Sequence, residues 1–349
     1  MNQENGLRKK NIAYIELLRI FASFFVIVNH TVTGEILAQN PGGKKWLVLT
    51  GYFFMCKIAV PVFLMISGIL LLGEVDSYKK NFQRIVRIIL DIVIFSLVYY
   101  IRNCYENKSS ISLFEFFKLI SSRHITNAFW YLYLYLGILI MLPLLQRLAI
   151  NMKKKDYQYL LVISVAFLGT MPILNHYFPN VEYHAMLSIP FLSEYVGIMF
   201  LGYYVHNYID IQKKYVLLSL ILMIICVGFQ VYATYIEYLK SPENYLFFDN
   251  RVFIPIIITS AAVLYLARWA ESVIHSDLVW RIIAFMGKMT FGIYLLSDLF
   301  IELYAGIHIE LMFHMNILVA LILYQIMVFG TGIIVTLLLK RIPFIKKII

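Results

Sequence analysis

Long apolar stretches separated by short polar ones run through the whole chain. A transmembrane helix needs about 20 mostly apolar residues, and ten stretches approach that length. They predict helices at 12–37, 51–72, 85–103, 128–150, 157–175, 189–209, 214–235, 252–270, 281–304 and 315–339. Pro61 lies inside the second stretch and predicts a kink there. The pattern therefore predicts an all-α integral membrane protein of about ten transmembrane helices, with residues 1–349 forming one domain.

The composition agrees with a chain that is mostly surrounded by lipid. Hydrophobic residues make up 61% of the sequence and charged residues only 14%, against about 25% charged residues in a typical soluble domain. Cys56, Cys104 and Cys226 lie in or beside apolar stretches and lack the spacing of metal ligands. We expect the three cysteines to be buried as small hydrophobic residues, and we expect no metal site.

Basic residues gather at the ends of the predicted helices. They occur at both termini and in the loops after the second, fourth, sixth and eighth predicted helices. With ten spans, all of these segments fall on one side of the membrane, and the excess of Lys and Arg marks that side as cytoplasmic. Both termini are thus predicted to be cytoplasmic. The net charge of +10 then suits anionic membrane lipid rather than nucleic acid.

The first predicted helix carries a polar stripe formed by Glu16, Arg19, Ser23 and His30. Arg19 and His30 are eleven positions apart, so they return to nearly the same helix face about 16 Å apart along it. In the predicted orientation, Arg19 lies towards the cytoplasm and His30 in the outer half. Ionisable residues inside a membrane are costly, and such a stripe is a candidate functional site.

Arginine and histidine suit two different tasks on this stripe. A guanidinium group binds phosphate or carboxylate through two parallel hydrogen bonds. An imidazole has a pKa near neutrality and suits a general base. The simpler interpretation is that Arg19 pairs with Glu16 one turn earlier and that His30 is a hydrogen-bonded core residue. Either residue alone favours that interpretation, whereas their shared face favours a function.

Several segments, taken in order, resemble the membrane acyltransferase-3 family, which includes surface-polysaccharide O-acetyltransferases. They are RIFASFFVIVNH (19–30), PVFLMISGILLL (61–72), RIVR (84–87), FWYLYLYLGILIMLPLL (129–145), FLGYYV (200–205) and GKMTFGIYLL (287–296). The resemblance covers nearly the whole chain. One position departs from it, because Ser297 and Asp298 stand where the family often has a histidine. The role of that histidine therefore has no counterpart here.

The resemblance implies transfer of an acyl group, commonly acetyl, from cytosolic acetyl-CoA or another acyl-CoA. The acceptor would be a hydroxyl of a cell-envelope glycan or glycolipid. The protein would be a multi-pass protein of a bacterial plasma membrane. In this interpretation, His30 is the catalytic base, and Arg19 helps catalysis by binding the charged part of CoA. Arg84 and Arg87 would also bind CoA, although they suit equally a role as positive-inside anchors.

Further polar groups are candidates for a substrate pocket: Glu16, Ser67, Trp130 and Tyr131. Trp130 and Tyr131 fit an interfacial aromatic belt equally well. Asp298 and Glu194 are acids in or near predicted spans, and they either pair with buried cations or orient a histidine. The sequence does not indicate the acceptor, the acyl length, the groups that stabilise an oxyanion, or the oligomeric state.

Two other classes of function share these features. A transporter or flippase for an anionic or sugar substrate also needs polar residues inside the membrane. A non-catalytic membrane sensor is the third possibility. The ordered segments favour the enzyme, and the lack of an internal repeat disfavours the transporter.

Overall fold

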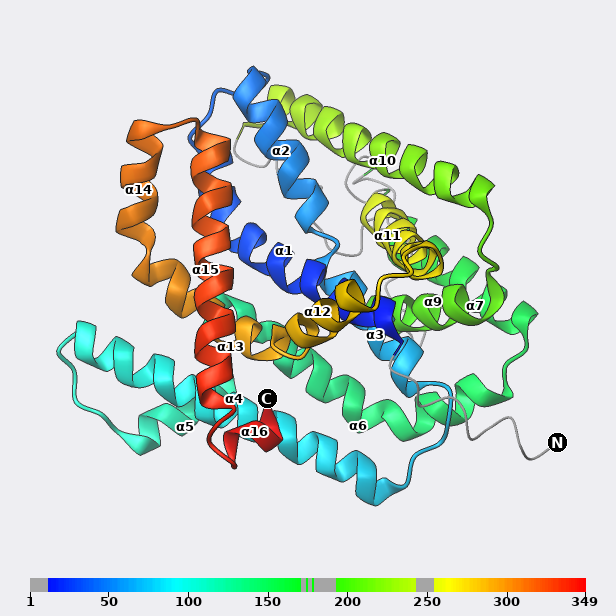
Figure 1. Cartoon of the computed structure of the whole chain (residues 1–349), viewed down its shortest axis with the longest axis horizontal. Helices are drawn as coiled ribbons and strands as arrows, with labels where there is room; N and C mark the ends of the chain where they lie inside the picture. Colours follow the sequence, from blue (N-terminus) through cyan, green and yellow to red (C-terminus); the bar gives the residue numbers. More distant parts are fainter. Residues whose placement is uncertain (1–11, 171–173, 175–177, 179–192, 243–253) are drawn as a thin grey trace.

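The computed structural model describes residues 12–170, 174, 178, 193–242 and 254–349, which form helices and connecting loops with no strand among them (Figure 1). The helices are α1 (Ala13–Leu37), α2 (Lys44–Cys56), α3 (Ala59–Leu71), α4 (Tyr78–Glu106), α5 (Leu113–Ser122), α6 (Trp130–Asn151), α7 (Lys154–Ser164), α9 (Glu194–Tyr208), α10 (Lys213–Lys240), α11 (Ile254–Val273), α12 (Asp277–Gly287), α13 (Thr290–Leu303), α14 (Ala305–His314), α15 (Ile317–Leu339) and α16 (Ile345–Ile348). A 3₁₀ turn, η1 (Asn127–Phe129), precedes α6, and a π-helical segment, η2 (Val165–Thr170), follows α7.

Six segments of the described chain are long and apolar enough to cross a membrane. They are α1, the α2–α3 pair, η1 with α6, α10, α11 and α15. A seventh is present if α12 and α13, which are bent by 55° relative to each other, form one span. These segments identify a multi-pass membrane protein.

The other predicted spans correspond to α4, α7 and α9, which are not among these segments. With 15 residues, α9 is roughly 22 Å long, less than the thickness of the apolar layer. The predicted helices 157–175, 189–209 and 252–270 extend into residues outside the described part. The full set of ten spans and the cytoplasmic termini therefore stay predictions.

The second predicted helix is interrupted just before Pro61, and its two parts, α2 and α3, together form one candidate span. The chain leaves α2 at Cys56, turns through Lys57 and Ile58, and starts α3 at Ala59. A proline ring clashes with the carbonyl group four residues earlier, which here belongs to Lys57. Pro61 itself lies in the first turn of α3, where its missing N–H costs no helical hydrogen bond. The break therefore falls one turn before the proline.

Helix α1 runs through the middle of the molecule and contacts α2, α3, α11, α12, α13 and α15 (Figure 1). Leu18, Ile27, Val28 and Val32 on α1 have no exposed surface. The neighbouring helices, rather than lipid, thus surround most of this helix. Most of its polar stripe consequently lies inside the bundle, where a polar side chain needs a partner or a ligand, while the side chain of Arg19 stays 33% exposed.

Helices α3 and α9 pack together through two glycines. A side-chain carbon at Gly68 would overlap the backbone carbonyl of Met199, and one at Gly202 would overlap the backbone of Met65. Small residues let membrane helices approach until their backbones touch. This crossing fixes α3, and with it the broken segment, against the rest of the bundle.

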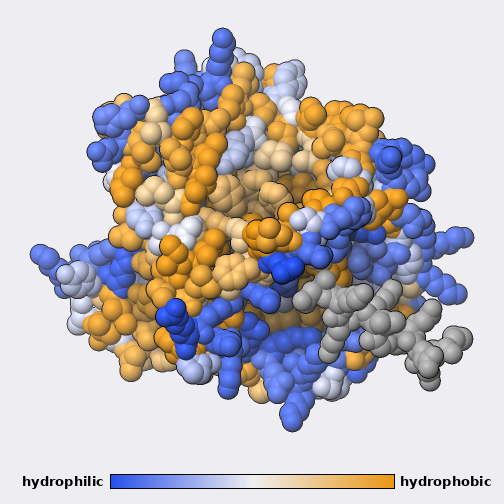
Figure 2. All heavy atoms as spheres, in the orientation of Figure 1, coloured by the Kyte–Doolittle hydropathy of each residue, from blue (hydrophilic) through white to orange (hydrophobic). Residues whose placement is uncertain are grey.

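Large apolar side chains cover the outside of the bundle. On α10 they are Leu217, Leu218, Leu220, Ile221, Ile224, Ile225, Phe229 and Tyr232, all exposed. Figure 2 shows hydrophobic residues over much of one face of the molecule, with hydrophilic residues towards its edges. Exposed apolar area of this extent is typical of a surface that contacts lipid. Cys56, Cys104 and Cys226 are instead buried, as predicted.

Candidate active site

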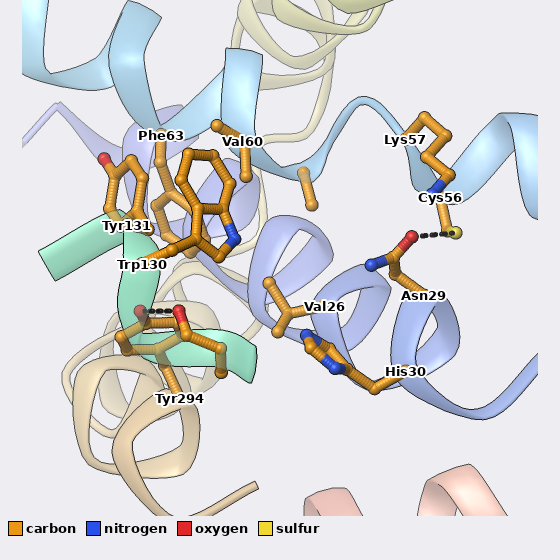
Figure 3. A pocket seen from close by; sticks show the side chains of 12 residues that line it. Val26, Asn29, His30, Cys56, Lys57, Val60, Phe63, Trp130, Tyr131 and Tyr294 are labelled. Atoms are coloured by element: carbon orange, nitrogen blue, oxygen red, sulfur yellow. Dashed lines mark hydrogen bonds between the residues drawn. The ribbon is translucent and has the colours of Figure 1, made fainter. Parts of the chain in front are cut away.

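A cavity opens beside the break between α2 and α3 (Figure 3). Four parts of the chain form its wall: the C-terminal half of α1, the α2–α3 junction, the start of α6 with η1, and α13. The lining residues are Val26, Asn29, His30, Cys56, Lys57, Ala59, Val60, Phe63, Ala128, Trp130, Tyr131 and Tyr294. Irregular backbone at membrane depth is typical of segments that line a cavity.

His30 and Asp298 face each other across the interface of α1 and α13. Nδ1 of His30 lies 3.6 Å from Oδ1 of Asp298, and their side chains are 17% and 10% exposed, respectively. The sequence left the role of Asp298 open between pairing with a cation and orienting a histidine. The structure places this carboxylate beside His30.

The carboxylate of Asp298 is itself held in place by the start of η1. Its Oδ2 accepts hydrogen bonds from the hydroxyl of Thr126 and from the backbone N–H of Ala128, the latter at 3.2 Å. The first N–H groups of a helix have no partner within the helix and bind an anion readily. Ser297, next to Asp298, instead donates to the carbonyl of Tyr294 within α13.

This arrangement fixes the chemistry that His30 offers. A carboxylate beside Nδ1 favours the tautomer with hydrogen on Nδ1 and a lone pair on Nε2. In Figure 3 the imidazole ring points into the cavity, towards Trp130 and Tyr294. An imidazole ring held in this way can accept a proton at Nε2 while the carboxylate stabilises the resulting cation.

Aromatic side chains form the wall opposite His30. The rings of Trp130 and Tyr131 pack edge to face with centroids 6.1 Å apart, and Tyr131 stacks on Tyr135 at 6.0 Å. Tyr294 donates a 2.6 Å hydrogen bond to the carbonyl of Ala128. Trp130 and Tyr131, for which the sequence allowed a place in an interfacial belt, therefore line the cavity.

A polar row leads from this wall towards the predicted arginines. Ser67 interacts with the hydroxyl groups of both Tyr131 and Tyr135, and its own hydroxyl donates to the carbonyl of Phe63 at 2.9 Å. The charges of three arginines, Arg19, Arg84 and Arg87, all reach the hydroxyl of Tyr135. The structure thus brings the three predicted arginines to one region, although none of them lines the cavity.

Each of these arginines has a partner within the chain. Nη1 of Arg19 lies 2.7 Å from Oε1 of Glu16, so Glu16 forms the predicted ion pair and is not part of the cavity wall. Nη1 of Arg84 lies 2.5 Å from Oδ2 of Asp76. Nε of Arg87 donates a 2.6 Å hydrogen bond to the carbonyl of Ile348.

Asp76 anchors the basic start of α4. Burial would raise the pKa of this carboxyl, but hydrogen bonds from Lys80, Arg84 and Gln146 together with the charge of Arg84 lower it to about 2. Sequence reasoning missed this residue, although an acid four positions before Lys80 and eight before Arg84 was a readable signal. It also missed Tyr135, because tyrosines at alternate positions of YLYLY mark no single helix face.

Comparison with known proteins identifies a family for this chain. No curated protein and no solved structure gives a significant match to this chain. A family profile described as an acyltransferase domain does match, over residues 12–341. The match covers all the elements that build the cavity, and the chain therefore belongs to the acyltransferase-3 family of membrane acyltransferases.

Proposed function

We propose that this protein transfers an acyl group, in the simplest case acetyl, from cytosolic acyl-CoA to a hydroxyl of a cell-envelope glycan or glycolipid. Membership of the acyltransferase-3 family supports the reaction class. The observation that carries the proposal is the His30–Asp298 pair at the wall of the cavity. The lipid-facing surface and the charge of the loops suit a multi-pass protein of a bacterial plasma membrane.

In the proposed reaction, Nε2 of His30 removes the proton from the acceptor hydroxyl as its oxygen attacks the thioester carbonyl. The new C–O bond forms, the C–S bond breaks, and the CoA thiolate leaves with the proton that His30 had taken. Asp298 stabilises the imidazolium ion between these two steps. General base catalysis of this kind contributes about 10²- to 10⁴-fold to a rate.

The donor would approach from the end of the molecule that carries the arginines. CoA has its phosphates at one end and its thioester at the end of a long flexible arm, which matches a cation cluster separated from a base. The phosphates of CoA would be bound by Arg19, Arg84 and Arg87. The flexible arm of CoA would run past Ser67, Tyr131 and Trp130 to reach His30. The partners of Arg19 and Arg84, Glu16 and Asp76, hold the two side chains in position beforehand.

Turnover of acyl-CoA by the purified protein in lipid discs tests this proposal. We expect His30→Ala to lower the rate by about 10²- to 10⁴-fold while donor affinity is retained. Arg19→Ala should instead weaken donor binding, by about tenfold for each 1.4 kcal/mol lost. His314→Ala, an exposed histidine on α14, is the matched control and should leave both quantities unchanged.

Unchanged turnover in His30→Ala would refute the assignment of the base. Unchanged donor affinity in Arg19→Ala would refute the division of roles along α1. Movement of an anionic or sugar solute across the membrane, without acyl turnover, would favour the transporter instead.

A further inference from the structure

Asn29 is a polar residue of the cavity wall that the proposed reaction does not use. It directly precedes His30 on α1, and neighbouring positions of a helix point about 100° apart. The cavity nevertheless touches both side chains, because its wall passes around α1 from the α2–α3 junction to η1 and α13. Figure 3 shows Asn29 on the side of Cys56 and His30 on the side of Tyr294.

The side-chain amide of Asn29 turns its oxygen towards the end of α2. The thiol of Cys56 donates to the carbonyl of Phe53 at 3.0 Å, and its Sγ lies 4.0 Å from Oδ1 of Asn29. In Figure 3 the amide nitrogen, Nδ2, points away from this sulfur and into the cavity. Among the described residues, no acceptor takes a hydrogen bond from Nδ2. The two N–H groups of the amide are therefore available to a molecule in the cavity.

Other donors of the cavity wall already have partners within the protein. The hydroxyl of Tyr294 donates to the carbonyl of Ala128 at 2.6 Å, and the backbone N–H of Ala128 donates to Asp298 at 3.2 Å. The ammonium group of Lys57 lies over the ring of Phe53, 4.0 Å from its centroid. Asn29 thus differs from these groups, because its donor is not used by the fold.

The proposed reaction needs a donor of this kind. When the acceptor oxygen attacks the thioester, negative charge develops on the carbonyl oxygen, and fixed N–H groups directed at that oxygen stabilise it. A neutral amide serves here without adding a buried charge, which would be costly inside the membrane. Because Asn29 and His30 are consecutive residues of one rigid helix, the donor and the base keep a constant spacing.

We propose that Nδ2 of Asn29 stabilises the oxyanion of the acyl-transfer reaction, an assignment that rests on the proposed function. As the new C–O bond forms, the π electrons of the carbonyl move to its oxygen, which accepts the hydrogen bond from Nδ2. When the C–S bond breaks, that electron pair restores the carbonyl, and the thiolate takes the proton from His30. Asn29 gains and loses no proton in either step.

Turnover and binding of acetyl-CoA by the purified protein in lipid discs provide the first test. We expect Asn29→Leu, which has a similar volume and no donor, to lower kcat by about 10²- to 10³-fold while donor affinity and melting temperature are retained. Asn29→Asp keeps the shape but replaces the donor by a carboxylate, so it should lower kcat at least as far. Asn103→Leu on an exposed position of α4 is the matched control and should change neither quantity.

The pH profile of kcat separates this role from an indirect effect on His30. An amide carries no charge, so Asn29→Leu should lower the whole profile without moving it along the pH axis. A profile that moves would mean that Asn29 acts through the base, and it would refute the assignment.

The carbonyl stretch of bound acetyl-CoA, labelled with ¹³C at the thioester carbon, provides a test that needs no turnover. We expect infrared spectra of His30→Ala to show a lower stretching frequency for the bound donor than for the free one, because a hydrogen bond from Nδ2 polarises the carbonyl. The double variant His30→Ala, Asn29→Leu should lose this shift, and His30→Ala, Asn103→Leu should keep it.

The outcomes distinguish this inference from the proposed function. Acyl turnover that is unchanged in Asn29→Leu, or an infrared shift that persists in the double variant, refutes the role of Asn29 and leaves His30 as the base. A loss of kcat that is matched by an equal loss of donor affinity or by a lower melting temperature indicates a structural role and also refutes it. A wild type that neither binds nor turns over acyl-CoA refutes the proposed function, and this inference with it.

Discussion

At the scale of single residues, the candidate site depends on a contact between α1 and α13. His30 and Asp298 lie far apart in the sequence, and each occurs in an apolar helix with little local indication of a partner. The spacing of Arg19 and His30 predicted the polar stripe because both lie on one helix, where geometry is regular. The role of Asp298 was not predictable in this way, since it depends on how two distant helices pack.

The Asp298 carboxylate should therefore act on catalysis through His30. We expect Asp298→Asn to lower kcat by about 10²- to 10⁴-fold, because an amide neither stabilises the imidazolium ion nor fixes the tautomer. Donor affinity should stay unchanged, and the pH profile of kcat should move with the pKa of His30. Asp277→Asn on the exposed start of α12 is the control. An unchanged kcat with an unchanged profile would contradict the pairing.

Asp76 gives a prediction about stability and pH. Its pKa is lowered to about 2 by its cationic partners, against about 4 in an unfolded chain. Its contribution to the free energy of unfolding is thus present above about pH 4 and is lost as the pH falls through about 2.

We expect Asp76→Asn to lower that free energy by about 1–3 kcal/mol at neutral pH. Thermal unfolding followed from neutral to acidic pH measures the difference between the wild type and the variant, which should shrink on acidification. A difference that grows as the pH falls would contradict the assigned direction of the pKa shift.

At the scale of elements, the sequence predicted helices best where an apolar run is uninterrupted. The predicted ranges 12–37 and 315–339 agree closely with α1 and α15. The second predicted helix is one candidate span, as expected, although its helical backbone is interrupted at Lys57 and Ile58, just before Pro61. The cavity lies at this interruption, which Pro61 indicated in the sequence and the hydrophobic pattern alone did not.

The crossing of α3 and α9 should be sensitive to one added methyl group. We expect Gly68→Ala to lower the free energy of unfolding by about 1–3 kcal/mol, since the new carbon meets the backbone of Met199 rather than a movable side chain. Gly228→Ala on α10 is the matched control, because nothing lies within 4 Å of the carbon that it adds. Equal melting temperatures for the two variants would contradict the close packing of α3 on α9.

At the scale of the whole molecule, orientation in the membrane follows from the charge of the loops. The loop that carries Lys153 is predicted to face the cytoplasm, and the surface that carries Glu310 is predicted to face outside. The donor and the acceptor would then reach the cavity from opposite sides of the membrane.

Cysteine labelling in intact cells tests this orientation. Lys153 and Glu310 are both exposed, so a cysteine at either position is open to a membrane-impermeant maleimide. We expect Glu310→Cys to react in intact cells and Lys153→Cys to react only after the membrane is permeabilised. The reverse pattern would invert the predicted topology and, with it, the side from which the donor approaches.

The burial of Cys56 makes its rate of alkylation a measure of how often the cavity wall opens. This thiol lies at the last residue of α2, in the cavity wall, and has no exposed surface. An alkylating reagent can reach it only when the junction of α2 and α3 moves aside. The rate of Cys56 alkylation therefore reports the frequency of this opening. A bound substrate that stabilises the closed wall will lower that rate, and the native cysteine serves as the label.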